Sequence, residues 1–368
     1  MNSPATNRRA FLKSAAAASA LALAGAGWAA ADSKVPGPRR RNILLGYDNF
    51  AVRAMKWNAR QLIDWAAELR TDSLFITDFG PFEGRHDDAA LAEIRKYAAD
   101  RALQIQLGSW SICPTSKTFK KDWGTADEHL ALGIRMAKAL GSPVFRAILG
   151  NGQDRPTDGG IEARIADTVK VLKAARSRAR DAGVKVAIEN HGGDMQAWEL
   201  VTLIKAAGTD FVGANLDSGN AAWTMEDPME NLEILGPHVL TTSLRDSAVW
   251  ETPNGAVVQW TAMGEGTVDL KMFFDRFEKL CPKAPVHIET ISGFPRELPF
   301  LKPDPNFWKA WPKLRERDLM RFIALAKRGK PIPPHRSANN AEEQTYQRGE
   351  VERSIRYCKE VLGLGLKA

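Results

Sequence analysis

Short apolar runs rich in β-branched residues alternate along this sequence with longer amphipathic stretches, and this alternation limits the possible folds more than any other feature. The pattern is typical of βαβ units, in which parallel strands are joined by helical crossovers. We expect eight strands, at residues 42–47, 73–77, 104–108, 144–149, 185–189, 211–216, 239–244 and 286–289. The amphipathic stretches between them include residues 59–69, 89–99, 127–140, 161–182, 197–206 and 270–280.

Eight strands with crossovers fit a closed (β/α)8 barrel, the TIM-barrel architecture, which needs about 250 residues plus insertions. We therefore predict an α/β protein with a single barrel domain over residues 42–327. A C-terminal helical extension follows at 328–368, with a last helix near 347–362 on the outside of the barrel. An open doubly wound sheet is the alternative, although the glycine-rich loop that would hold a nucleotide in such a sheet is missing.

The N-terminus has the organisation of an export signal. Arg8 and Arg9 precede a weakly apolar run at residues 14–27, and the paired arginines resemble a twin-arginine signal. The run is too short for a membrane span, which needs about 20 residues. We predict a signal peptide over 1–31, a linker over 32–41, and a periplasmic or secreted protein without a stable membrane anchor.

Net charge and cysteine content limit the kinds of partner that we expect this protein to bind. The formal net charge is +7, but three basic residues and no acid lie in the predicted signal, leaving 48 basic against 44 acidic side chains. This excess is too small to indicate a nucleic-acid partner. The three cysteines, at 113, 281 and 358, are too scattered for a disulfide framework or a thiolate zinc site. We expect a small-molecule partner, and the sequence is compatible with a homo-oligomer.

Three acidic residues end three of the predicted strands. Glu189, Asp217 and Glu289 each follow an apolar run, and in a barrel the carboxyl ends of the strands form the active-site face. Converging carboxylates repel one another unless a cation compensates for their charge. Their oxygen atoms favour manganese as a divalent metal cofactor, with magnesium, cobalt or zinc as alternatives. A helix cap or a surface salt bridge is the alternative role for each single acid.

Five short motifs occur in a specific order along the chain. They are 187–191 (AIENH), 216–220 (LDSGN), 243–246 (SLRD), 263–266 (MGEG) and 287–289 (HIE). In this order they resemble the xylose isomerase-like barrels, which include sugar phosphate isomerases, ketose 3-epimerases and DNA repair enzymes of the endonuclease IV type. The resemblance covers about residues 40–325.

The resemblance implies a set of metal ligands. In the ketose epimerases of this family, the ligands are a glutamate after strand five, an aspartate after strand six, a histidine on strand seven and a glutamate after strand eight. Glu189, Asp217 and Glu289 match three of them, whereas Ser243 stands where the histidine should be. A serine hydroxyl is a poorer ligand than imidazole. His287 lies two residues before Glu289, on the same face of the strand, and is a further candidate ligand.

The resemblance also implies a reaction. In the epimerases, the metal polarises a carbonyl and its neighbouring hydroxyl, and the two glutamates transfer the proton. Glu189 and Glu289 would then be the acid/base pair, and His191 a further acid/base or hydrogen-bonding residue. We expect a metal-dependent isomerase or epimerase of a sugar or polyol. A lyase that cleaves oxidised (keto) glycosides is one alternative, and a non-catalytic sugar-binding barrel, favoured by Ser243, is another.

Other polar and aromatic residues are candidates for substrate binding. We expect Trp260, with Gln259 beside it, to stack on a sugar face and donate a hydrogen bond, and Arg245 and Asn220 to contact the substrate. Asn220 stands where endonuclease IV enzymes have a metal-binding histidine, which disfavours a nuclease. The arginines that are candidates for binding an anion are Arg146, Arg245 and Arg296.

Overall fold

The computed structural model describes residues 39–302 and 305–367. The account below concerns the compact unit of residues 38–368. The predicted signal peptide lies outside the described residues. Within them, no helix is both long and apolar enough to cross a membrane.

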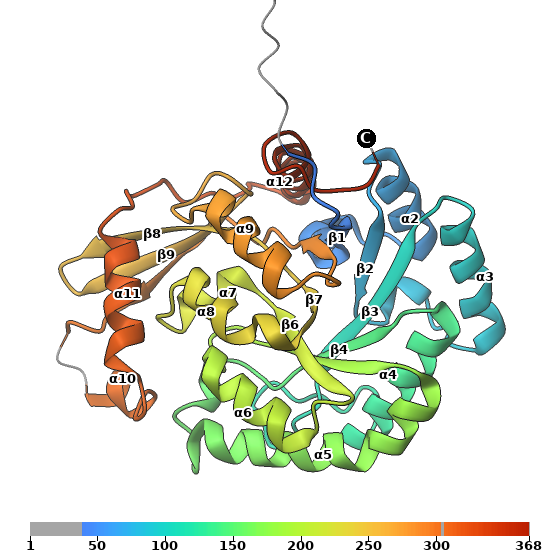
Figure 1. Ribbon diagram of the computed structural model, residues 1–368, viewed down its shortest axis with the longest axis horizontal. Coiled ribbons are helices and arrows are strands. Elements are labelled where there is room, and N and C mark those ends of the chain that lie inside the picture. Colours follow the sequence, from blue (N-terminus) through green and yellow to red (C-terminus); the bar gives the residue numbers. More distant parts are fainter. Residues whose placement is uncertain (1–38, 303–304, 368) are drawn as a thin grey trace, which may run out of the picture. The chain divides into compact units, whose positions relative to one another are not determined.

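Eight parallel strands form the central sheet (Figure 1). They are β1 (Leu45–Asp48), β2 (Ser73–Thr77), β3 (Gln104–Ser111), β4 (Val144–Ile148), β5 (Lys185–Glu189), β6 (Val212–Leu216), β7 (Val239–Thr242) and β10 (Val286–Ile288). The strand order is β10-β1-β2-β3-β4-β5-β6-β7, and a parallel bridge between Leu244 and Ile288 joins its two ends. The predicted (β/α)8 barrel is therefore confirmed, and the open sheet is excluded.

Helices on the outside of the barrel connect the strands. They are α2 (Ala59–Glu68), α3 (Asp88–Ala99), α4 (Ala126–Leu140), α5 (Gly160–Ala182), α6 (Ala197–Ala207), α8 (Pro228–Leu235) and α9 (Leu270–Leu280), and a short α7 (Ser218–Trp223) follows β6 directly. Local sequence fixes several starts: the Thr125 side chain accepts from the backbone N–H of Glu128, whose carboxylate accepts from that of Thr125. This capping box sets the start of α4.

The last helix, α12 (Asn340–Glu360), takes the place of the eighth barrel helix. It packs against β1 and β10, and Val351, Ile355 and Cys358 belong to the main hydrophobic core. It begins earlier than the predicted 347–362. The segment after it is tied to the start of the barrel, because the Gly365 N–H donates to the Ile43 carbonyl at 3.0 Å.

A second sheet interrupts the barrel after β7. It is antiparallel, in the order β11-β9-β8, with β8 (Asp246–Thr252), β9 (Gly255–Thr261) and β11 (Pro295–Leu298). A separate apolar cluster, which includes Val258 and Phe322, packs this sheet against α11 (Glu316–Ala326), and α10 (Pro305–Lys309) precedes that helix. This sheet was not predicted from the sequence, and Trp260, expected to stack on a sugar face, lies on β9.

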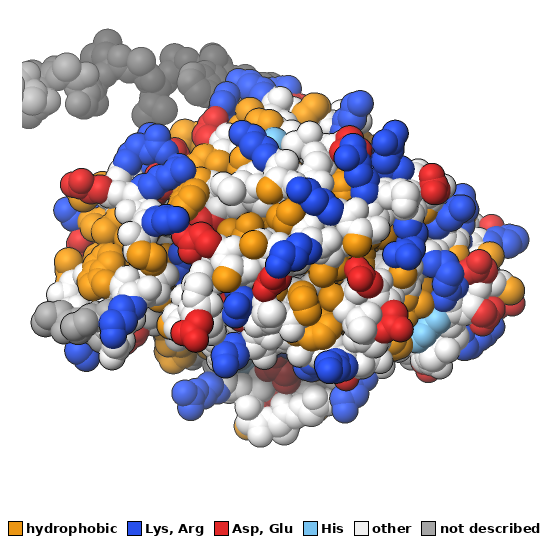
Figure 2. All heavy atoms as spheres, turned by 90° about the horizontal axis from the view of Figure 1, so that it is seen from below, with side chains coloured by type: hydrophobic (Ala, Val, Ile, Leu, Met, Phe, Trp, Pro, Cys, Tyr) orange, Lys and Arg blue, Asp and Glu red, His pale blue; other side chains and the backbone are white. Residues whose placement is uncertain are grey.

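Basic side chains are interspersed with other types on the one face of the surface that Figure 2 shows. On the face shown in Figure 2, Lys and Arg side chains alternate with acidic and apolar ones. Several are paired, as in the contact of Arg276 Nε with Glu233 at 2.6 Å. Exposed pairs of this kind contribute little stability, roughly 0 to 1 kcal/mol each.

Candidate active site

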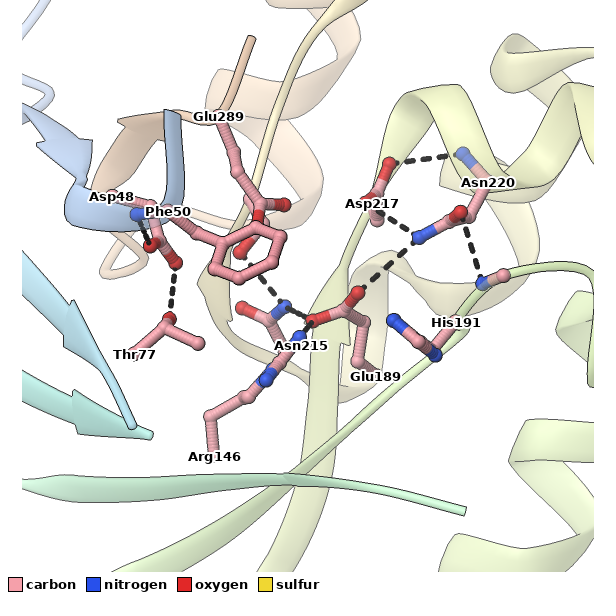
Figure 3. A network of polar contacts seen from close by, with 12 residues as sticks. Asp48, Phe50, Thr77, Arg146, Glu189, His191, Asn215, Asp217, Asn220 and Glu289 are labelled. Atoms are coloured by element: carbon pink, nitrogen blue, oxygen red, sulfur yellow. Dashed lines mark hydrogen bonds and ion pairs between the residues drawn. The ribbon is translucent and has the colours of Figure 1, made fainter. Parts of the chain in front are cut away.

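Three carboxylates converge at the carboxyl end of the barrel (Figure 3). Glu189 is the last residue of β5, Asp217 directly follows β6, and Glu289 directly follows β10. One oxygen of each lies within 4.8 Å of the others, and all three residues are buried. The three acids singled out from the sequence thus form one cluster, because the ends of parallel strands meet at the same edge of the barrel.

Two buried arginines neutralise much of the charge of this cluster. On β4, Arg146 places Nη2 at 2.5 Å and Nε at 2.6 Å from Glu189 Oε2. Arg245 places Nη2 at 2.6 Å from Asp217 Oδ2, and the same nitrogen contacts Glu289 Oε2. Two guanidinium groups thus compensate for two of the three acids. Sequence analysis assigned this compensation to a metal alone. Arg245, predicted to contact the substrate, also lines the cavity above the cluster.

Burial also changes the protonation of the acids. Burial raises the pKa of Asp217 well above its usual range, while Arg245 opposes this rise. The pKa of Glu289 is raised for the same reason, again against the effect of Arg245. Carboxyl groups in such surroundings retain a proton to higher pH than exposed ones, which is a property of catalytic acids and bases.

Amide side chains complete the polar network around the cluster. Asn220 Nδ2 donates to Asp217 Oδ2 at 2.6 Å and to Glu189 Oε1 at 3.2 Å. Asn215 Nδ2 donates to Glu189 Oε2 at 2.8 Å and to Ser243 Oγ at 3.1 Å. The residue that replaces the family histidine therefore accepts a hydrogen bond within this network.

A fourth acid, which sequence analysis missed, lies beside the cluster. Asp48 ends β1 and accepts hydrogen bonds from the Phe50 N–H at 2.8 Å and from Thr77 Oγ1 at 2.5 Å. Burial, together with the charge of Glu289, raises its pKa to about 8. The signal was present in the sequence, because Asp48 follows the first apolar run just as Glu189 ends the fifth.

His191 is held in one tautomer at the edge of the cavity. Its Nδ1 lies 2.6 Å from the Gly150 carbonyl oxygen. A carbonyl only accepts hydrogen bonds, so Nδ1 carries the proton and Nε2 is the acceptor. Burial, helped by the positive charge of Arg146, lowers the pKa of His191 to about 4 and keeps the ring neutral.

Two other residues named from the sequence do not face the cavity. His287 lies deeper in the barrel, with Nε2 3.0 Å from Ser73 Oγ and Nδ1 3.4 Å from Thr241 Oγ1. Both ring nitrogens thus have hydroxyl partners, and this geometry does not support metal ligation. Gln259 donates through Nε2 to the Pro333 carbonyl at 3.0 Å and is not among the residues that line the cavity.

The cavity above the cluster has a volume of about 600 Å³. Its polar wall includes Glu189, Glu289, His191 and Asn220, and its aromatic wall consists of Phe50, Trp110, Trp223 and Trp260. Trp260 stacks on Trp223 with ring centroids 3.9 Å apart and an interplanar angle of 13°. The size and the mixed lining suit a small polar molecule with apolar C–H faces.

The donor atoms of the cluster fit a hard divalent cation, with one competitor. Three carboxylates supply the oxygen ligands that manganese or magnesium prefers. A cation bound there would be held by Glu189, Asp217 and Glu289, and it would compete with Arg245 for the last two. Neither Ser243 nor His287 supplies a fourth ligand in this arrangement.

The protein belongs to the class of (β/α)8 barrels that carry a polar cavity at the carboxyl ends of their strands. Buried acids, a neutral imidazole and aromatic side chains line this cavity. Within this class, the chain belongs to the xylose isomerase-like TIM barrel family, whose model matches residues 63–324. The resemblance inferred from the five motifs is confirmed.

Two curated proteins are similar in sequence. The protein YihM of Escherichia coli (strain K12) is 23% identical over 268 residues, which cover 70% of this chain and 76% of YihM. The 3-oxo-isoapionate decarboxylase of Pectobacterium atrosepticum is 21% identical over 187 residues. These cover 51% of this chain and 60% of the decarboxylase, so the similarity spans only part of that enzyme.

Solved structures of sugar epimerases share the fold. A D-psicose 3-epimerase, solved in the presence of D-fructose, superposes with a TM-score of 0.55 at 16% identity, covering 88% of this chain and 100% of that one. An L-ribulose 3-epimerase gives 0.54 at 16% identity, covering 89% and 100%. The IOLI protein with a bound zinc atom gives 0.55 at 14% identity, covering 77% and 99%. At these identities, the likeness concerns the fold.

Proposed function

We propose that this protein is an isomerase or epimerase that moves a proton on the carbon next to the carbonyl of a sugar or related polyol. The observation that carries this proposal is that Glu189 and Glu289, from two non-adjacent strands, both line one cavity with their carboxylates close together. A pair of carboxylates around one carbon can remove a proton and return one. The epimerases that share the fold support the same chemistry.

Each residue of the site has a task in such a reaction. One of the two glutamates removes the proton, and the positive charges of Arg146 and Arg245 stabilise the negative charge that develops on the substrate oxygen. His191 accepts a hydrogen bond from a substrate hydroxyl through Nε2. A divalent metal, when bound to the acids, would polarise the carbonyl and the hydroxyl beside it.

A lyase is the second candidate, and one comparison favours it. The relative from Pectobacterium atrosepticum is named as a decarboxylase of a 3-oxo acid. Loss of carbon dioxide next to a carbonyl, like loss of a proton, leaves negative charge on the carbonyl oxygen. The same arginines would stabilise that charge, and elimination from a keto-glycoside would begin with the same proton removal.

A non-catalytic sugar-binding barrel is the third candidate. It is suggested by Ser243, which stands in place of a metal-binding histidine. The cost of burying Glu189, Asp217 and Glu289 argues against it, because a barrel that only binds sugar has no need of this acidic cluster. We also propose export through the twin-arginine signal at residues 1–31, which is supported by Arg8, Arg9 and the apolar run that follows.

Exchange of substrate C–H protons with deuterated water tests the proposed chemistry. We expect exchange on at least one ketose or keto-glycoside, measured by NMR with manganese present, and a loss of at least about 10²-fold in Glu189→Gln and Glu289→Gln. Glu199→Gln is the matched control. Glu199 is buried and forms an ion pair with Arg155 at a distance of 2.8 Å. It does not line the cavity.

Measurement of bound metal distinguishes a metal-dependent reaction from one that needs only the arginines. Bound manganese, cobalt or zinc that is absent from an Asp217→Asn, Glu289→Gln double variant would support the metal-dependent form. Exchange without bound metal would show that the arginines suffice. Sugar binding without any exchange or bond cleavage would overturn the enzymatic proposal in favour of the binding protein.

A further inference from the structure

Three arginines line the cavity, and they differ in their partners. Arg146 is paired with Glu189, and Arg245 with Asp217 and Glu289. Arg296 lines the same cavity, but no hydrogen bond or ion pair joins its side chain to another residue in the described part of the chain. The sequence suggested three arginines as candidates for binding an anion. Among them, only Arg296 has no acidic partner in the described part of the chain.

Arg296 is held in place by aromatic stacking. It lies on β11, opposite Val258 of β9, and its guanidinium carbon is 4.2 Å from the ring centroid of Trp223. Trp223 stacks on Trp260, and the guanidinium carbon of Arg245 lies 4.3 Å from the Trp260 ring. Two indoles are thus stacked between two guanidinium groups. Both guanidinium groups line the cavity, but only that of Arg245 is neutralised by acids.

Two glycines let the Arg296 guanidinium lie against the backbone. A Cβ added to Gly193 would lie 3.3 Å from Nη2 of Arg296, and one added to Gly152 would lie 3.4 Å from it. Gly193 has φ +84°, which disfavours a larger residue as well. The distance at Gly193 is tighter than an ordinary contact, and the distance at Gly152 is at the lower limit of one. Any side chain at these positions would crowd the guanidinium edge that the stacking on Trp223 leaves free.

The chemistry of this position selects a class of ligand. Burying a guanidinium by half without an acidic partner costs solvation free energy. Stacking on an indole offsets only part of this cost. Stacking uses the face of the guanidinium and leaves its N–H groups in the plane, where they form the two-pronged donor that matches a carboxylate. The lining has no other unpaired basic side chain, so a singly charged carboxylate fits better than a doubly charged phosphate.

We propose that Arg296 binds the carboxylate of an acidic sugar, so that the substrates of this enzyme are sugar acids. The carboxylate lies on Arg296, and the carbonyl end lies between Glu189 and Glu289. This inference rests on the proposed function for the reacting end of the substrate. It adds the substrate class, and it makes Arg296 a specificity-determining residue.

Binding to matched pairs of compounds tests the proposal. The probes are D-glucuronate against D-glucose, D-gluconate against D-glucitol, and D-glucose 6-phosphate, measured by calorimetry on the full chain. We expect at least one acid to bind at least tenfold more tightly than its neutral partner and than the phosphate. Arg296→Gln should remove this preference, and Arg296→Lys should restore less than half of it, because lysine lacks the planar pair of donors.

Arg315 provides the matched control. Its guanidinium also stacks on an indole, 4.7 Å from the Trp198 ring, but it does not line the cavity. Arg315→Gln should leave the preference for acids unchanged. The thermal midpoints of both variants should stay close to that of the unmodified protein, which shows that a loss of binding is not a loss of folding.

The outcomes separate this inference from the proposed reaction. Equal affinity for acids and neutral partners, or a preference that survives in Arg296→Gln, overturns the carboxylate subsite. Tighter binding of the phosphate overturns it as well. If acids bind through Arg296 but no C–H exchange or bond cleavage follows, the subsite stands and the proposed reaction is wrong. If acidic sugars exchange no faster than their neutral partners and equally fast in Arg296→Gln, the reaction stands and the subsite is wrong.

Discussion

Arg245 Nη2 lies 2.6 Å from Asp217 Oδ2, and both residues are almost fully buried. The same nitrogen reaches Glu289, and the face of the guanidinium covers Trp260. One side chain thus connects the acidic cluster with the aromatic wall of the cavity. It also occupies the region where a cation would have to bind, so the charge of the site depends on whether Arg245 or a metal compensates for the acids.

Removing Arg245 should make the protein depend on divalent metal for stability. Arg245→Gln leaves Asp217 and Glu289 without their cation, which we expect to cost on the order of 3 kcal/mol in the free energy of unfolding. Added manganese should recover more stability in this variant than in the unmodified protein. Thermal unfolding with manganese and with a chelator measures both effects.

The control for this prediction is another buried ion pair. Arg155 Nη2 donates to Glu199 Oε1 at 2.9 Å, outside the cavity. Arg155→Gln should also lose stability, but manganese should not recover it. Equal responses of the two variants to manganese would contradict competition between Arg245 and a metal.

His191 should act on the rate of reaction more than on folding. His191→Phe removes the acceptor Nε2, and we expect kcat to fall by about 10²-fold with a smaller change in KM. His191→Asn can still donate to the Gly150 carbonyl, so it should keep the loop conformation. Steady-state kinetics of both variants measure the effect, and an unchanged kcat would place His191 outside the reaction.

Trp223 and Arg296 should be coupled. Trp223→Leu removes the ring on which Arg296 stacks, so the guanidinium loses its orientation. We expect each single variant to weaken the binding of a sugar acid, and the double variant to be less harmful than the sum, with a coupling of about 1 kcal/mol. Calorimetric titration of the four proteins gives this value, and strict additivity would show that the stack does not orient Arg296.

Glu226 gives a pH dependence of stability away from the active site. Burial raises its pKa from 4.5 to about 8. Between these values the folded protein keeps a proton that the unfolded chain releases, so this residue lowers stability as the pH rises. Below pH 4.5 both states are protonated, and the penalty is absent.

Glu226→Gln removes this titration. We expect the stability of the variant, relative to the unmodified protein, to increase with pH by at most about 1.4 kcal/mol per unit between pH 4.5 and 8. Urea unfolding at several pH values measures the difference. A constant difference for Glu226→Gln would mean that its pKa is not raised.

The barrel was predictable because its signals are local. The predicted strands at 73–77 and 185–189 coincide with β2 and β5, and the helix at 270–280 coincides with α9. Glu189 and Asp217 could be assigned to one face for the same reason, since a polar residue after an apolar strand must lie at the end of the barrel.

The rest depends on contacts between distant segments. The sheet that contains β8, β9 and β11 was missed because β11 is distant from β9 in the sequence. It pairs with β9 although α9 and β10 lie between them in the chain. The pairing of Arg245 with Asp217 was missed because the direction of a long side chain is set by packing, here by Trp260. Gln259 was misjudged similarly: neighbours on a strand point to opposite faces, so it cannot share the cavity with Trp260.

The position of α12 has a consequence for how the protein is made. This helix packs against β1, the first strand, yet it comes after all the barrel strands in the chain. During synthesis, the eight strands therefore leave the ribosome before the helix that covers β1 and β10. The nascent protein exposes apolar strand surface until α12 has been made, so the arrival of this helix is the step that protects it from aggregation.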